Sequence, residues 1–173
     1  MPKEIERRFL VNHNAFMSAI ETSKTKPVTI TQGYLCKGDN TIRVRLVESF
    51  HIGRFPSSLV EAFITIKSRR VGISADEYEY SIPEHHANEI LSHMCKDAII
   101  SKQRYSTFHD GFEWAVDVFL GENAGLIIAE LELPDESTEF NKPAWVAEEI
   151  SSDHRYSNAN LSTEPFTLWG RRR

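Results

Sequence analysis

Six short segments of this chain alternate charged and apolar residues with a period of two, and the charged residues are of types that form binding sites. The charged residues of these segments are Glu4, Glu6, Arg8, Arg43, Arg45, Lys67, Glu77, Glu79, Lys102, Arg104, Glu130 and Glu132. Because successive side chains of a β-strand point to opposite faces, each segment would have, as a strand, one ionic and one apolar face. Arginine and lysine bind polyanions, and carboxylates bind hard divalent cations, so the set predicts a site for both.

The ordinary interpretation of a single such strand is different. Its apolar row would face the core and its charges would meet water, where ion pairs have little energetic value. The charges of this chain, however, are sorted by sign: Arg43 is followed by Arg45, and Glu130 by Glu132. Ion pairing on a surface gives no reason for that sorting. We therefore expect the charged rows to face one another around one site.

Length and composition predict one soluble domain over residues 1–173, because a chain of 173 residues with 40% apolar content can bury a core. The net charge of −5 provides no long-range field for nucleic acid, so an anionic ligand needs a local basic cluster. The basic tail at 171–173 is interpreted as a solvated chain end. No apolar run reaches the ~18 residues of a membrane span, and Cys36 and Cys95 match no metal or redox spacing. We expect a cytoplasmic protein with reduced thiols and no membrane partner.

Local patterns predict about eight strands and four short helices. The expected strands are 3–11, 28–36, 41–48, 59–68, 73–82, 99–109, 112–120 and 126–133, and the expected helices are 13–22, 84–94, 143–150 and 153–162. Asn12 is the expected cap of the first helix, Pro83 opens the second, and Asp110-Gly111 is a hairpin turn signal. The Pro- and Ser-containing stretch at 51–58 is expected to be a loop.

Short connections make most of these strands antiparallel, which predicts an α+β fold built on a closed antiparallel β-barrel. Amphipathic helices need a partner surface, so we expect them on the outside, covering the apolar rows. The charged rows then face inward. An eight-stranded barrel has an interior that side chains nearly fill or that holds one small ligand. We therefore predict a hydrophilic tunnel in which buried charges are satisfied by one another, water, metal or a polyanion.

The order of these motifs resembles that of a known family. Glu4-Ile5-Glu6-Arg7-Arg8 resembles the E-x-E-x-K opening strand of the CYTH superfamily, also called triphosphate tunnel metalloenzymes. The match continues through Gln32-Gly33-Tyr34-Leu35, Arg43-Val44-Arg45, Thr65-Ile66-Lys67, Glu77-Tyr78-Glu79, Lys102-Gln103-Arg104-Tyr105, Val116-Asp117-Val118-Phe119, Glu130-Leu131-Glu132 and Asp153-His154-Arg155-Tyr156-Ser157-Asn158. One such motif is weak, but an ordered series over essentially the whole chain is specific.

The resemblance implies a role for each row. The phosphate-binding residues would be Arg8, Arg43, Arg45, Lys67, Lys102 and Arg104, and the metal-binding residues Glu4, Glu6, Asp117, Glu130 and Glu132. Tyr34, Glu77 and Glu79 would also line the tunnel, although Tyr34 could instead belong to the core. The implied cofactor is Mg²⁺ or Mn²⁺, which bridges phosphate oxygens. Glu4 or Glu6 would orient the attacking water.

The expected function is therefore metal-dependent hydrolysis of inorganic triphosphate or a related short triphosphate. Two alternatives stay open: a class IV adenylyl cyclase or organic-triphosphate phosphatase, and a module that binds polyphosphate or nucleotide without turnover. The expected partner is a small triphosphate rather than nucleic acid, and a homodimer is compatible with the sequence.

Two positions depart from the family pattern. Arg8 stands where the opening motif has Lys, which keeps the charge but replaces an ammonium by a guanidinium that does not give up its proton. Ser157 stands where the C-terminal pattern often has Lys, so one basic contact near the tunnel mouth is expected to be missing. Asp153 and Asn158 are expected to cap the last helix rather than to bind ligand.

Overall fold

The computed structural model describes residues 3–50 and 58–170, so most of the expected loop at 51–58 and the basic tail at 171–173 lie outside the described residues. The described strands are β1 (Lys3–Val11), β2 (Val28–Cys36), β3 (Thr41–Phe50), β4 (Ser58–Lys67), β5 (Ser74–Ser81), β6 (Ile100–His109), β7 (Phe112–Phe119), β8 (Ile127–Glu132) and β9 (Val146–Glu149). The helices are α1 (His13–Ser23), α2 (Glu84–His93) and α3 (Asn158–Thr163), with single 3-10 turns at Gly121–Asn123, His154–Tyr156 and Phe166–Leu168.

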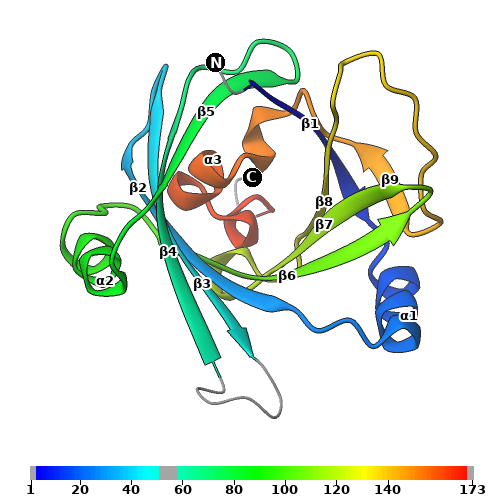
Figure 1. The fold of residues 1–173 in the computed structure, drawn as a ribbon, viewed down its shortest axis with the longest axis horizontal. Helices are drawn as coiled ribbons and strands as arrows, with labels where there is room; N and C mark the ends of the chain where they lie inside the picture. The colour runs from blue at the N-terminus through cyan, green and yellow to red at the C-terminus, as the bar shows by residue number, and fades with distance from the viewer. Residues whose placement is uncertain (1–2, 51–57, 171–173) are drawn as a thin grey trace.

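Eight of these strands form the closed antiparallel barrel that the sequence predicts (Figure 1). The strand order is β5-β4-β3-β2-β6-β7-β8-β1, and pairing of β1 with β5 closes the ring. β1 closes the ring because its two parts pair with different strands. Residues Lys3–Ile5 pair with β5, whereas residues Glu6–Leu10 pair with β8. The strand that carries the opening motif is therefore also the strand that closes the barrel.

The expected helix at 143–150 is wrong, because this segment contains β9. The edge of β1 that β5 leaves uncovered pairs with β9 at Phe9 and Val11. The backbone amide of Asn12 donates to the Trp145 carbonyl (2.9 Å), and that of Ile150 donates to the Arg8 carbonyl (2.8 Å). The unpaired backbone groups at this strand edge favour strand pairing over the local helix propensity of the segment.

Helix α1 covers an apolar face of the barrel, as predicted. Asn12 caps it by accepting a hydrogen bond from the Ala15 amide (3.1 Å). Phe16 is fully buried and packs edge-on against Tyr105 and Trp145, with ring centroids 5.6 and 5.3 Å away. Burying aromatic rings in this geometry supplies both apolar area and favourable ring contacts.

Helix α2 covers the outer face of β3 and β4. Ala87 and Leu91 pack there against Val44 and Ala62, all four of them buried. Gly33 of β2 lies under the end of this helix, where an added Cβ atom would be 2.7 Å from the Cys95 Sγ atom and 3.0 Å from a methyl group of Leu91. The close approach of α2 to the barrel therefore requires a glycine on β2.

Helix α3 does not join this outer coat. In Figure 1 it lies inside the outline of the barrel, and Leu161 packs with Ile100, Phe119 and Ile128 in one buried cluster. Ile100 and Ile128 belong to the same strand rows as Arg104 and Glu130, because they are an even number of residues away. The inward face thus changes from charged to apolar along the barrel, and the apolar end packs against the C-terminal segment.

The hairpin signal is confirmed. β6 and β7 are joined by Asp110-Gly111, with His109 paired to Phe112 and φ angles of 49° and 82° in the two turn residues. Positive φ at both positions is the geometry of the tight hairpin turn that this dipeptide favours. No helix in the described ranges is long and apolar enough to cross a membrane.

We predict that Gly33→Ala destabilises the protein, because the added methyl group must displace α2 or the side chains beneath it. The expected loss in the free energy of unfolding is about 1–3 kcal/mol by denaturant titration. Gly38→Ala is the matched control, since an added Cβ atom meets nothing within 4 Å and Gly38 is not among the glycines with positive φ. It should change the free energy of unfolding by less than about 0.5 kcal/mol. Equal stabilities of the two variants would contradict this packing.

Candidate active site

The charged rows line one cavity of about 1320 Å³ inside the barrel. Among the described residues the lining contains eight basic side chains, Arg8, Lys37, Arg43, Arg45, Lys67, Arg69, Arg70 and Arg104. It also contains eight acidic ones, Glu4, Glu6, Asp39, Glu77, Glu79, Glu113, Glu130 and Glu132. The cavity is therefore nearly balanced in charge, as expected for a site that holds an anion together with a cation.

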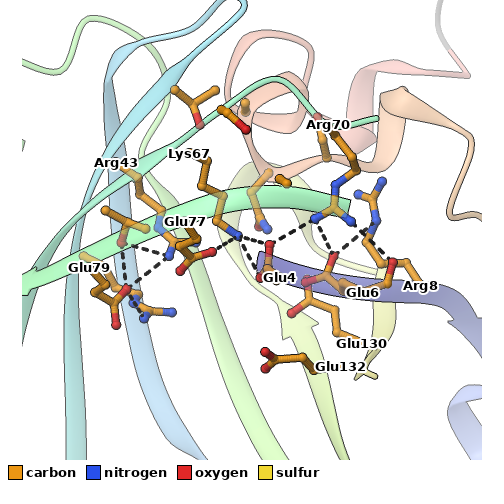
Figure 2. A pocket seen from close by; sticks show the side chains of 18 of the residues that line it. Glu4, Glu6, Arg8, Arg43, Lys67, Arg70, Glu77, Glu79, Glu130 and Glu132 are labelled. Atoms are coloured by element: carbon orange, nitrogen blue, oxygen red, sulfur yellow. Dashed lines mark hydrogen bonds and ion pairs between the residues drawn. The ribbon is translucent and has the colours of Figure 1, made fainter. Parts of the chain in front are cut away.

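Lys67 of β4 lies between two carboxylates. Its Nζ atom is 2.8–2.9 Å from both oxygens of Glu4 and 2.5 Å from Glu77 (Figure 2). Burial acts to raise the pKa of Glu4, but the charges of Lys67 and Arg70 outweigh it and hold that pKa below its ordinary value. Burial likewise acts to lower the pKa of Lys67, and the Glu4 and Glu6 charges raise it instead. Both groups are therefore charged near neutrality.

Arg70 is a site residue that sequence reasoning missed. It follows β4, outside any strand, and its guanidinium donates to Glu4 (3.2 Å), Glu6 (3.4 Å) and the Ile73 carbonyl (2.9 Å). Strand alternation cannot detect such a residue. The only signal was the basic pair Arg69-Arg70 shortly after the Lys67 row.

At the left side of Figure 2, Glu79 of β5 forms ion pairs with the two arginines of β3, Arg43 and Arg45. Its Oε2 atom is 2.9 Å from Arg45 Nη2 and 3.5 Å from Arg43 Nη2. The buried hydroxyl of Thr65 donates to the same oxygen (2.7 Å) and accepts from Arg43 Nη2 (3.1 Å). Arg43, Thr65 and Glu79 are direct partners across β3, β4 and β5, so the strand register assembles this group.

Lys102 and Asp117 lie deeper, and neither is among the side chains that line the cavity. Asp117 is fully buried; its oxygens accept two hydrogen bonds from Arg104 (2.7 Å each) and one from Lys102 (2.5 Å). Burial acts to raise the pKa of Asp117, but the Arg104 and Lys102 charges hold it well below its ordinary value. In this structure Asp117 thus orients Arg104, which also binds Glu130, rather than facing the cavity.

Arg8 faces the cavity despite its departure from the family pattern. It is 6% exposed; its Nη2 atom donates to the Ser151 carbonyl (3.4 Å), and its Nε atom lies 3.7 Å from Glu6. Within residues 3–50 and 58–170 this Nε atom has no hydrogen-bond partner. A buried guanidinium with an unused donor is suited to an anionic ligand.

Carboxylates of the neighbouring strands β1 and β8 line the same cavity, and Glu6 lies close enough to Glu130 to be affected by its charge. Glu6 is the direct cross-strand partner of Glu132, and Arg8 that of Glu130. Burial, followed by the nearby Glu130 and Glu4 charges, raises the pKa of Glu6 to about 7. Like charges in such positions repel unless a cation joins them.

Glu6, Glu130 and Glu132 all line the cavity and offer the carboxylate oxygens that a hard divalent cation prefers. No group of three or more His, Cys, Asp or Glu side chains in the described part of the chain is arranged as a ready-made metal site. A cation here would therefore complete its coordination with ligand oxygens and water, as Mg²⁺ commonly does.

The remaining predicted residues are placed as follows. Tyr34 lines the cavity and is also buried, with its hydroxyl accepting from the Gln32 amide (3.3 Å), so both interpretations of this residue hold. Asn158 is not a helix cap: Ser157 caps α3, and Asn158 accepts from Lys102 (3.3 Å). Asp153 caps the preceding 3-10 turn instead of α3.

The chain and its fold match known proteins. A family model described as CYTH domain covers residues 2–164. An inorganic triphosphatase of Acetivibrio thermocellus is 42% identical over 167 residues, which is 96% of this chain and 97% of the relative. An inorganic triphosphatase of Nitrosomonas europaea is 32% identical over 162 residues, or 92% and 96% of the two chains. A solved inorganic triphosphatase structure aligns with a TM-score of 0.62 at 29% identity, covering 94% of this chain and 95% of that one.

The crowding of carboxylates around Glu6 predicts a pH-dependent cost to folding when no metal is bound. Since the pKa of Glu6 rises from 4.5 in ordinary surroundings to about 7 in the fold, the folded state retains a proton that the unfolded state has lost between these values. Stability from this group is present below pH 4.5 and is lost as the pH rises to 7, by an amount on the order of 3 kcal/mol.

Glu6→Gln should remove this loss. In chelator, its free energy of unfolding relative to the parent protein should increase by up to about 3 kcal/mol between pH 4.5 and pH 8, as measured by denaturant unfolding. Glu89→Gln on the exposed surface of α2 is the control and should follow the parent at every pH. Parallel profiles for all three proteins would refute the shifted carboxyl group.

Proposed function

Because this chain belongs to the CYTH domain family, we propose that it is an inorganic triphosphatase whose substrate lies in the cavity of the barrel. The observation that carries the proposal is the convergence of basic and acidic rows from β1, β3, β4, β5, β6 and β8 on that single cavity. Two relatives that align over nearly their whole length are inorganic triphosphatases, which supports the same substrate.

The basic residues provide a path for a linear phosphate chain. Arg43 and Arg45 lie on β3, Lys67 on the neighbouring β4, and Arg8 and Arg104 on strands across the cavity. Guanidinium groups donate two parallel hydrogen bonds to phosphate, whereas the Lys67 ammonium is a compact point charge. A chain of three phosphoryl groups can therefore be contacted from several sides at once.

Glu6, Glu130 and Glu132 are the residues that would hold Mg²⁺ or Mn²⁺ in this proposal. When bound, such a cation neutralises phosphate charge and polarises the phosphoryl group. The crowding of these carboxylates, with a pKa of about 7 for Glu6, supports this assignment. Asp117 is left out of the metal set, because Arg104 and Lys102 already use its oxygens.

Hydrolysis requires a water molecule in line with the leaving phosphate oxygen. The water oxygen forms the new P–O bond, the P–O bond of the anhydride breaks, and a carboxylate accepts the proton of the water. Both oxygens of Glu4 are already bound by Lys67 at 2.8–2.9 Å, whereas the Glu6 contacts to Arg8 and Arg70 are longer, 3.7 and 3.4 Å. Glu6 is thus the better candidate for orienting the water, and Glu4 for positioning Lys67.

Substrate tests separate this function from the alternatives. The purified protein should release phosphate from inorganic triphosphate with Mg²⁺ or Mn²⁺, and chelator should abolish the release. ATP and thiamine triphosphate, assayed in parallel, should be poorer substrates, and no cyclic AMP should form. Formation of cyclic AMP would select the cyclase alternative, and tight binding of triphosphate without any product would select the binding module.

Glu6→Gln should reduce triphosphate turnover by at least about 100-fold, because the amide cannot accept the proton of the water. The measurement is kcat and KM with saturating metal, together with the melting temperature as a check of folding. Glu89→Gln removes an equal charge from the surface of α2 and should leave both constants unchanged. A Glu6→Gln protein with the parent rate would place the proton acceptor elsewhere.

A further inference from the structure

Glu79 occupies the two arginines that the proposed function assigns to phosphate. Its Oε2 atom contacts both guanidiniums, at 2.9 Å for Arg45 and 3.5 Å for Arg43, and accepts from Thr65 as well. The arginine side chains are only 16% and 13% exposed. Phosphate oxygens would have to take the same positions, so the carboxylate and an anionic ligand exclude each other at these donors.

The arginine pair needs an anion in the absence of ligand. Two guanidiniums from the same face of β3 repel each other, and partial burial increases that repulsion. The Nε atoms of both arginines are buried and have no hydrogen-bond partner within the part of the chain that the structure describes. Glu79 therefore compensates the charges but leaves donors unused, and a phosphate group could satisfy them more completely.

Glu79 also has more freedom to leave its partners than Asp117 or Glu4. Its side chain is 31% exposed, compared with 0% for Asp117, which three hydrogen bonds hold in place. Glu4 is 16% exposed and binds Lys67 and Arg70 together. Because its side chain is already partly exposed, rotation away from the arginines would bring the Glu79 carboxylate toward water.

We propose that Glu79 is an internal competitor for Arg43 and Arg45 that weakens the binding of short phosphate anions and so favours release of the hydrolysis product. The inference rests on the proposed function. Any anion that accepts from the Nη2 atoms of this arginine pair must displace Glu79. Triphosphate offsets the free energy lost in displacing Glu79 by making further contacts with Lys67, Arg8 and Arg104. Pyrophosphate and orthophosphate are shorter and make fewer of these contacts. Glu79 is thus a specificity-determining residue rather than a permanent part of the phosphate site.

The proposal is tested by whether Glu79→Gln strengthens or weakens the binding of pyrophosphate. Glu79→Gln keeps the size of the side chain and an oxygen that can accept from Thr65, but removes the competing charge. Pyrophosphate, titrated calorimetrically into the protein with chelator and again with Mg²⁺, should bind about tenfold more tightly to Glu79→Gln than to the parent. Under turnover, pyrophosphate should also become a stronger inhibitor of triphosphate hydrolysis.

Two controls isolate the arginine pair. Glu89→Gln removes a charge from the exposed surface of α2, outside the cavity, and should change the affinity by less than about twofold. In a protein that carries Arg43→Ala and Arg45→Ala, adding Glu79→Gln should also change the pyrophosphate affinity by less than about twofold, because the arginines for which Glu79 competes are absent.

The outcomes separate this inference from the proposed function. If the parent protein binds pyrophosphate and Glu79→Gln binds it equally or more weakly, Glu79 positions the arginines and the competition is overturned. A gain that persists without the two arginines would overturn it too. If neither the parent nor any variant binds pyrophosphate or triphosphate under either condition, the proposed function fails, and this inference fails with it.

Discussion

The structure depends on balancing the many charges that it places inside a barrel. An isolated buried charge is unfavourable by many kcal/mol, and attraction to a partner offsets this only when the geometry is good. The equal numbers of basic and acidic side chains around the cavity meet that requirement. Each basic group that is available to a phosphate chain already has an internal partner: Lys67 has Glu4 and Glu77, Arg104 has Asp117 and Glu130. Binding a ligand is therefore an exchange of ion pairs, not the filling of an empty basic pocket.

The same strand closes the barrel and carries three residues of the proposed site. β1 pairs with β5 through its first residues and with β8 through the rest, and its inward row is Glu4, Glu6 and Arg8. Closure places Glu6 opposite Glu132 and next to Glu130, which creates the carboxylate crowding that a divalent cation would relieve. A barrel has no free edge at this point, so these positions are fixed by hydrogen-bonded neighbours on both sides.

The interior is divided along the barrel. Ion pairs occupy the cavity, while Ile100, Phe119 and Ile128 pack with Leu161 of α3 at the other end. Lys102 and Asp117 lie at the boundary, nearly or fully buried, and Asp117 accepts hydrogen bonds from both Lys102 and Arg104. The apolar end excludes water from that side and makes the inner ion pairs stronger than they would be in solvent. In the proposed function, the residues that position the substrate are thus also residues that stabilise the fold.

The alternation of residues in the sequence determined by itself the eight strands of the barrel and which of their side chains share a face, because the period of two is a property of the extended chain. Local chemistry likewise determined the Asn12 cap and the Asp110-Gly111 turn. Only the tertiary structure decided that residues 146–149 form a strand against β1, that α3 packs within the barrel, and that Arg70 joins Glu4 and Glu6. It also decided that Asp117 binds Arg104 instead of lining the cavity. These features arise from hydrogen bonds and packing between segments far apart in the chain, which no local pattern records.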